Sequence, residues 1–277
     1  MENIYEDRLI PVTSVTSGII QPVTTDVFCL PIQIANVVFI GRPGDKGWVL
    51  VDAGMPRSSE NIISAAEERY GRNNKPAAII LTHGHFDHVG AITDLIDHWD
   101  VPVYAHELEL PFLTGKESYP KGDPTVDAGL VAKASPMFPN HSINLDEHIH
   151  QLDANGQISQ LPDWQWIHTP GHTKGHISLY REKDGTLIAG DAFVTVKQES
   201  LYKVITQTQE ISGPPKYFTT NWDEAWESVN KLQRLSPNIA VTGHGQPMSG
   251  MFLKEELEKL SKHFDTIAIP EHGRYVH

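Results

Sequence analysis

Four residues that could bind a metal ion lie together in one short segment of the chain. The segment Thr82-His83-Gly84-His85-Phe86-Asp87-His88 offers three imidazoles and one carboxylate within six residues. It directly follows Ala77 to Leu81, a short apolar run that is typical of a buried strand. Imidazole nitrogens and carboxylate oxygens are donors that zinc and related divalent ions accept. Because an unliganded cluster of this density would strain its own electrostatics, the segment predicts part of a metal site.

Three further segments have the same design, in which a donor follows an apolar strand beside glycine. They are Ile167 to His176, which contains His172; Leu187 to Asp191, which ends on the carboxylate; and Val241 to Gly245, in which Gly243 and Gly245 flank His244. Pro170 fixes the backbone before His172 and Gly171 frees it, while the glycines around His244 would let a bulky ion approach the backbone. Each segment alone is also typical of a structural or exposed residue, but together with the first they favour one shared site.

The composition limits which ligands and partners are plausible. The chain has 277 residues, 15 histidines, one cysteine and a formal net charge of −13. The lone Cys29 excludes an internal disulfide and a thiolate cluster, so any metal must be held by His and carboxylates. The acidic balance repels phosphate backbones, so no nucleic-acid partner is expected.

The elements that must position these donors alternate between strands and helices. Strands are predicted at 27–34, 36–40, 48–52, 77–81, 101–104, 165–169, 177–181, 186–189 and 239–242, and helices at 58–70, 89–99, 222–235 and about 251–264. This order indicates an α/β protein whose helices cover its sheets. We expect a single domain over residues 1–277, made of two sheet-and-helix halves.

Two irregular stretches interrupt the alternation, at about residues 111–150 and 194–221. The first is rich in proline and glycine, and the second contains Gly213-Pro214-Pro215. Long irregular insertions in a compact domain are often lids or binding loops, so both are expected near the active site, although a surface excursion without function is equally consistent with the first.

No targeting or membrane segment is visible in the sequence. The N-terminus, Met-Glu-Asn-Ile-Tyr-Glu-Asp, is acidic and lacks the cationic start and apolar run of a signal peptide. No uncharged apolar stretch of about 18 residues follows. We therefore expect a cytoplasmic protein with no membrane partner; the oligomeric state is left open, a homodimer included.

The order of the donors along the chain closely resembles the metallo-β-lactamase superfamily of metallohydrolases, from about Val27 to His244. The resemblance implies a four-layer αβ/βα sandwich with a dinuclear metal site at one edge. The implied ligands are His83, His85 and His172 for one ion and Asp87, His88 and His244 for the second, with Asp191 bridging the pair.

Two other residues match positions near the ligands of that family. Asp52, in Val51-Asp52-Ala53-Gly54, resembles the early strand-end Asp that orients a ligand imidazole, although a plain turn carboxylate is the alternative. His176 matches a histidine that the family often has without using it as a ligand. Other histidines, such as His141, His148 and His150, are expected to be surface or packing residues.

The implied site predicts a hydrolase. Two divalent ions, expected to be Zn²⁺ with iron or manganese as alternatives, would generate a bridging hydroxide as the nucleophile and polarise the scissile carbonyl. Asp87 is the predicted catalytic residue, which would orient that hydroxide and pass its proton toward the leaving group.

Comparison with the branches of the family narrows the substrate. The chain is similar to glyoxalase II-like thioesterases around Thr169 to Thr173, although no clear basic glutathione-binding cluster follows His244. Acyl-homoserine lactonases share the ligand set but place a Tyr where this chain has Phe193 and Val194. Flavodiiron oxygen reductases have Glu at His85, persulfide dioxygenases use a single iron, and secreted β-lactamases need an export signal.

The prediction that follows is a metal-dependent hydrolase of an ester, lactone or thioester of a small molecule. Aromatic residues that could line its pocket, or equally belong to the core, are Phe193, Tyr202, Tyr217, Phe218 and Trp222. The alternatives are a phosphodiesterase or ribonuclease of the same superfamily and a non-catalytic metal-binding sensor.

Overall fold

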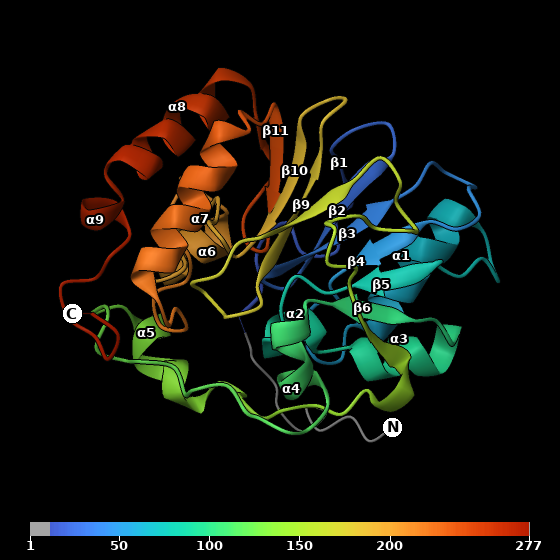
Figure 1. Cartoon of the computed structure of the whole chain (residues 1–277), viewed down its shortest axis with the longest axis horizontal. Coiled ribbons are helices and arrows are strands. Elements are labelled where there is room, and N and C mark those ends of the chain that lie inside the picture. The colour runs from blue at the N-terminus through green and yellow to red at the C-terminus, as the bar shows by residue number, and fades with distance from the viewer. Residues whose placement is uncertain (1–11, 277) are drawn as a thin grey trace. The chain divides into compact units, whose positions relative to one another are not determined.

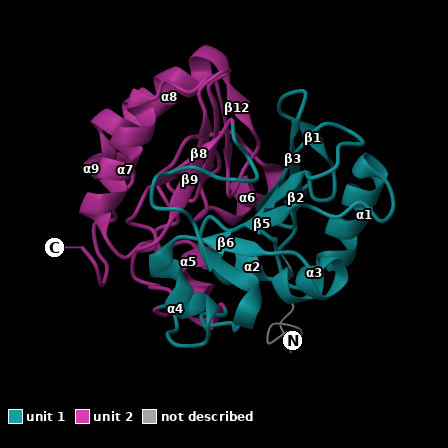
Figure 2. Cartoon of the chain, turned by 45° about the vertical axis from the view of Figure 1, so that its right-hand side comes forward, with its two compact units in different colours: residues 1–119, 139–162 teal, residues 120–138, 163–277 magenta. Residues whose placement is uncertain are grey.

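The computed structural model describes residues 12–276 (Figure 1). The acidic N-terminal segment, from which no signal peptide was predicted, lies outside these residues. The chain divides into two compact units, coloured separately in Figure 2. Unit 1 is Met1–Tyr119 with Pro139–Pro162, and unit 2 is Pro120–Phe138 with Asp163–His277. Each unit has its own sheet and helices, which confirms the predicted mixed α/β class. The single-domain assignment stays a prediction.

Unit 1 is built on a seven-stranded sheet in the order β1-β2-β3-β4-β5-β6-β7. Strands β1 to β4 pair antiparallel, and β4 to β7 pair parallel. Its elements are β1 (Gln21–Pro22), β2 (Val27–Ile32), β3 (Ala35–Ile40), β4 (Val49–Val51), α1 (Ser59–Tyr70), β5 (Ala78–Ile80), α2 (Phe86–Val89), α3 (Ile92–Trp99), β6 (Val103–Ala105), η1 (Glu107–Glu109), α4 (Leu110–Leu113), η3 (Asp146–His148) and β7 (Ile149–Gln151).

Aromatic packing fixes α1 and α3 of unit 1 against the sheet. Trp48, next to β4, stacks on Tyr70 at the end of α1 with ring centroids 4.4 Å apart, and it meets Trp99 of α3 edge-on at 5.5 Å. All three rings are buried. Burial of one large apolar side chain contributes about 1.5–3 kcal/mol, so this cluster anchors both helices.

The helix predicted over residues 89–99 is two helices in the structure, α2 and α3. The break falls at Gly90, whose N–H donates to the carbonyl of Gly54 at 2.8 Å. A Cβ at Gly90 would lie 2.2 Å from the backbone nitrogen of Pro56, so only glycine permits this close approach. Helix α2 therefore begins earlier, at Phe86, and contains two of the predicted metal ligands.

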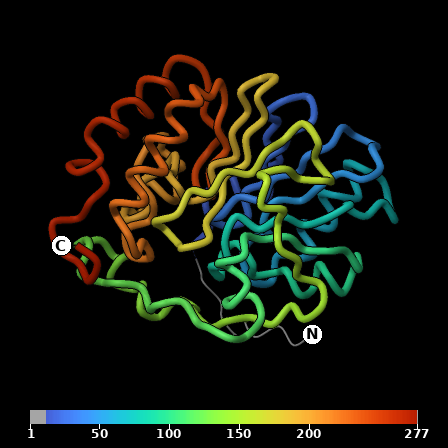
Figure 3. The backbone as a smooth tube through the Cα atoms, viewed as in Figure 1, coloured from blue at the N-terminus to red at the C-terminus, as the bar shows by residue number. Residues whose placement is uncertain are grey.

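Unit 2 is built on a five-stranded sheet in the order β12-β11-β10-β9-β8, in which only β10 and β11 pair parallel. Helices α7 and α8 lie side by side, which can be followed as the orange and red coils of Figure 3. Their apolar faces share one buried core with β10 and β11. The elements are α5 (Leu130–Ala134), η2 (Ser135–Met137), β8 (Gln165–His168), β9 (Ile177–Arg181), β10 (Thr186–Gly190), α6 (Leu201–Thr206), α7 (Trp222–Arg234), β11 (Ile239–Thr242), β12 (Met248–Ser249), α8 (Gly250–Lys262) and α9 (Phe264–Ile267).

The two irregular stretches contain more order than the sequence indicates. The first holds α4, α5 and β7, and it is divided between the units, because residues 120–138 belong to unit 2. The second holds the short helix α6, which Ser200 caps by accepting a hydrogen bond from the N–H of Lys203. Across residues 12–276, no helix is both long and apolar enough to cross a membrane.

Candidate metal centre

The unit 1 cluster consists of His83, His85, Asp87 and His88, which follow β5 at its carboxyl end. His83 and His85 lie in the loop after the strand, and Asp87 and His88 lie on α2. All four side chains are buried. The ring centroid of His83 is 4.7 Å from that of His85 and 4.2 Å from that of His88, so the imidazoles converge on a small volume.

Asp52 connects the neighbouring strand β4 to this cluster. Its carboxylate accepts hydrogen bonds from the backbone N–H of Thr82 at 2.7 Å, from the Thr82 hydroxyl at 2.8 Å and from Nδ1 of His88 at 2.8 Å. Asp52 reaches them from a left-handed backbone conformation, with φ of 61°, which Asp tolerates better than most residues. The carboxylate is therefore an orienting group rather than a plain turn residue.

The unit 2 cluster consists of His172, Asp191 and His244. His172 lies in the turn between β8 and β9, Asp191 directly follows β10, and His244 follows β11. Oδ2 of Asp191 lies 3.5 Å from Nε2 of His172 and 3.2 Å from Nε2 of His244. One carboxylate oxygen thus faces both imidazoles.

Glycines in the unit 2 loops serve chain packing. A Cβ at Gly245 would lie 2.3 Å from Oγ1 of Thr195, whose hydroxyl hydrogen-bonds the carbonyl of Gln246 at 2.7 Å. Thr195 therefore occupies the space beside Gly245 that was expected to admit a metal ion. Gly171 has φ of 126° and lies against the backbone of Ala225 on α7, so it also permits a close approach.

In three of the histidines, a hydrogen bond at Nδ1 determines which ring nitrogen carries the lone pair. The Thr82 hydroxyl donates to Asp52, so it accepts from Nδ1 of His83 at 3.1 Å. The Thr219 hydroxyl donates to the carbonyl of Pro215, so it accepts from Nδ1 of His172 at 3.2 Å. His88 donates from Nδ1 to Asp52 in the same way. Each of these rings therefore has its lone pair on Nε2, the form required of a neutral metal ligand.

His176 is held through both of its ring nitrogens. Nδ1 lies 3.1 Å from the carbonyl oxygen of Thr169, and Nε2 accepts the backbone N–H of Asp191 at 2.8 Å. The ring therefore fixes the backbone at Asp191 from behind. This agrees with the expectation that His176 supports the site without being a ligand.

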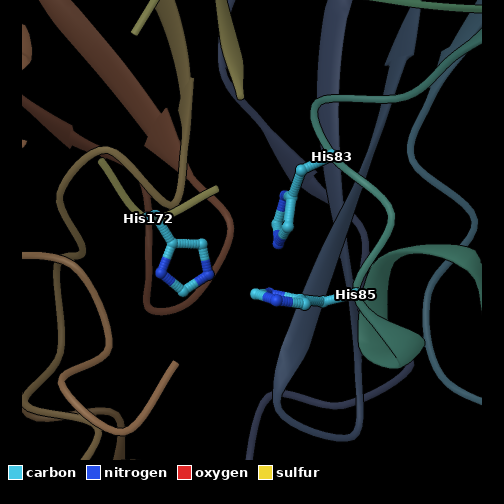
Figure 4. Close-up of side chains that lie close together, drawn as sticks. All are labelled: His83, His85 and His172. Carbon is cyan, nitrogen blue, oxygen red and sulfur yellow. The ribbon is translucent and has the colours of Figure 1, made fainter. Parts of the chain in front are cut away.

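The donor set fits divalent ions of the zinc, iron and manganese type. Figure 4 shows three of its imidazoles, those of His83, His85 and His172. The seven predicted ligands are five imidazoles and two carboxylates, all buried. Burial raises the pKa of the Cys29 thiol, so the chain's one cysteine stays protonated and supplies no thiolate. The available chemistry is nitrogen and oxygen ligation, which does not distinguish among these metals.

The aromatic residues considered as pocket walls have different environments. Phe193 and Trp222 belong to the buried core of unit 2. Tyr217 and Phe218 pack around Phe138, with ring centroids 6.0 and 6.1 Å from it. Tyr202, on α6, is 74% exposed.

The sequence did not predict that Glu109 and Tyr119 contact Gly84, or that Thr219 contacts His172. Glu109 accepts a hydrogen bond from the N–H of Gly84, between two predicted ligands, although 25 residues separate them. Thr219 lies 47 residues from His172. No local spacing rule connects such pairs, so only the folded chain identifies them.

Comparison with known proteins identifies the family. Residues 31–244 match the family described as "Metallo-beta-lactamase superfamily". The chain is 48% identical over 262 residues to "Probable metallo-hydrolase YflN" of Bacillus subtilis (strain 168), with 94% of this chain and 99% of the relative covered. It is 28% identical to "Probable metallo-hydrolase YybB" of the same organism, with coverage of 83% and 88%.

Solved structures share the fold. The BLEG-1 B3 metallo-beta-lactamase superposes with a TM-score of 0.57 at 25% identity, covering 84% of this chain and 93% of that one. TTHA1623 in a di-iron-bound form gives a TM-score of 0.51 at 25% identity, with coverage of 87% and 94%. The chain is therefore a metallo-hydrolase that belongs to the metallo-beta-lactamase superfamily.

Proposed function

We propose that this protein uses two divalent ions, with zinc as the expected metal, to hydrolyse an ester, lactone or thioester of a small molecule. The observation that carries the proposal is the placement of Asp191, whose Oδ2 faces Nε2 of both His172 and His244. A carboxylate held between two imidazoles is suited to bridging two ions.

The two clusters would act together as one ligand set. We propose that His83, His85 and His172 bind one ion, and that Asp87, His88 and His244 bind the other. The proposal is supported by the donor types in each group and by the Nε2 lone pairs that the Nδ1 hydrogen bonds impose on His83, His88 and His172. The di-iron form of TTHA1623 is a relative with two metal ions.

When bound, the ions would supply a nucleophile from water near neutral pH and polarise the scissile carbonyl. Within the protein, Asp87 would accept the proton released by that water and deliver it to the leaving group. His176 would keep the backbone at Asp191 in place. The burial of the clusters would limit the access of competing water.

The charge of the chain supports a small neutral acyl substrate over a nucleic acid. The formal net charge is −13, and two divalent ions would reduce it only to about −9. A polyanionic backbone would still be repelled at long range. The cytoplasmic location stays a prediction.

Metal analysis and a substrate panel test this proposal. Elemental analysis of the purified protein is expected to give about two ions per chain, since each proposed group holds one. Stripping with a chelator should abolish hydrolysis of p-nitrophenyl esters, lactones or thioesters, and adding the metal back should restore it. A single iron per chain, or faster cleavage of bis(p-nitrophenyl) phosphate than of every carboxylic substrate, would contradict the proposal.

A β-lactam is the second candidate substrate, because one structural neighbour is named a B3 metallo-beta-lactamase. Adding a penicillin and a cephalosporin to the same panel distinguishes the two. If the penicillin and the cephalosporin are hydrolysed faster than the esters, lactones and thioesters, a β-lactam is the substrate class.

Replacing Asp52 by asparagine should weaken metal binding by about 10–100-fold, the usual cost of losing a partner that orients a ligand. The amide would place an N–H donor against either Thr82 or His88, both of which donate to the native carboxylate. Asparagine tolerates the left-handed backbone at this position, so the change is confined to the side chain. The metal Kd is measured by competition with a chromophoric chelator.

The matched control is Asp45→Asn, because Asp45 also accepts a backbone N–H in unit 1, from Arg42 at 2.8 Å, but at an exposed position. Its Kd should equal that of the wild type. Equal Kd values for the Asp52 and Asp45 variants would show that Asp52 does not orient a ligand.

A further inference from the structure

Two buried polar side chains contact the loop that carries His83 and His85. Glu109, at the end of η1, is 0% exposed, and Tyr119, after α4, is buried with it. Both belong to unit 1. The segment that follows β6 therefore returns to the loop that follows β5.

Three polar groups meet at Gly84, the residue between the two histidines. The Gly84 N–H lies 3.0 Å from Oε2 of Glu109 and 3.0 Å from the Tyr119 hydroxyl oxygen. The Tyr119 hydroxyl donates to the same Oε2 of Glu109. Oε2 of Glu109 thus accepts hydrogen bonds from the Tyr119 hydroxyl and from the Gly84 N–H, and it fixes both donors.

The same tyrosine also contacts a histidine ring. The Tyr119 and His85 rings meet edge-on with centroids 4.5 Å apart, and the phenol ring also stacks on Phe112 at 4.0 Å. A Cβ at Gly84 would lie 2.6 Å from the Tyr119 hydroxyl, so the loop passes too close for any larger residue. Glu109 and Tyr119 therefore hold both the backbone at Gly84 and the ring of His85.

We propose that Glu109 and Tyr119 are positioning residues that preset the His83-Gly84-His85 loop for metal binding. This inference rests on the proposed function in that it takes His83 and His85 as ligands. Fixing the Gly84 amide fixes the backbone on both sides of it, and the ring contact limits the rotation of His85. A site held in its bound geometry loses less conformational entropy when the ion enters, which raises affinity.

Two nearly isosteric variants test the inference. Tyr119→Phe removes only the hydroxyl and keeps the contacts with Phe112 and His85, and Glu109→Gln removes the charge but keeps the shape. Each is expected to raise the metal Kd of the stripped protein by about 10–100-fold. The double variant should lose less than the product of the two single effects, because the residues act through one hydrogen-bond network.

Further readouts separate positioning from a general loss of stability. At saturating metal, kcat should return to near the wild-type value in both variants, because neither residue touches the reacting atoms. Cobalt-substituted protein should show a changed visible absorption spectrum. Tyr70→Phe is the control, because it removes a buried phenol hydroxyl of the same unit that donates to the carbonyl of Gly41, and its Kd should not change.

Two outcomes would overturn the inference. The first is a wild-type Kd in both Tyr119→Phe and Glu109→Gln. The second is a rise in Kd that is fully accounted for by a smaller folded fraction of the stripped variant, measured by circular dichroism. If the wild type binds metal but hydrolyses no substrate of the panel, the proposed function fails while these Kd measurements still decide the positioning role.

Discussion

Replacing Asp87 by alanine is expected to lower kcat at least about 10²–10⁴-fold, the range that general acid–base groups contribute. The proposed role gives Asp87 two tasks, binding the second ion and moving the proton, so the loss should fall at or beyond the upper end. The fold should survive, because the residue lies in the first turn of α2 and alanine is a strong helix former. Steady-state kinetics at saturating metal, with circular dichroism of the same samples, measures both effects.

Asp97→Ala is the matched control for that experiment. Asp97 is an exposed carboxylate of α3 in the same unit, so its removal changes the net charge equally without altering the cluster. The control should retain wild-type kcat and KM. Wild-type kinetics in Asp87→Ala would remove this residue from the mechanism, and an equal loss in the control would assign the effect to net charge.

The largest expected effect on stability comes from Gly171→Ala. The added Cβ would lie 2.3 Å from the backbone nitrogen of Ala225, and φ at this position is 126°, a conformation that residues other than glycine rarely adopt. Backbone strain and overpacking each cost about 1–3 kcal/mol, so the free energy of unfolding should fall by about 2–6 kcal/mol. Urea denaturation of the metal-free protein measures this change.

The consequence should extend to the metal centre. The carbonyl of Gly171 accepts the backbone N–H groups of Thr220 and Asn221, both at 3.0 Å, so the turn before His172 is tied to the start of α7. A displaced turn would move His172, and the metal Kd should rise together with the loss of stability.

Gly250→Ala provides the comparison in the same unit. Gly250 also has a positive φ, of 71°, but a Cβ there would meet nothing within 4 Å. Only the conformational cost should appear, about 1–2 kcal/mol. If Gly171→Ala unfolds at the same urea concentration as Gly250→Ala, the close approach of α7 does not constrain the turn.

Local patterns predicted most of the regular structure. The alternation of short apolar runs and amphipathic stretches located nine of the strands that carry or flank the site, with bounds within a few residues. The three short strands β1, β7 and β12 were missed, since two or three residues give no periodic signal. The break between α2 and α3 was also missed, because it depends on the packing of Gly90 against Pro56.

The sequence by itself determined which donor atoms this protein can offer to a metal ion. The types and order of His83, His85, Asp87, His88, His172, Asp191 and His244 specify nitrogen and oxygen ligation, and strand ends and glycine-flanked turns are local features that can be recognised without a fold.

Tertiary structure alone decided how those donors are held. Asp52 reaches Thr82 and His88 because β4 and β5 pair in parallel, and Glu109 and Tyr119 reach Gly84 because the chain after β6 folds back. These partners come from separate segments, and hydrogen bonds of a few ångströms form only once long-range packing has brought the segments together. The predicted ligands can thus be recognised from local sequence, whereas their orientation is a property of the whole fold.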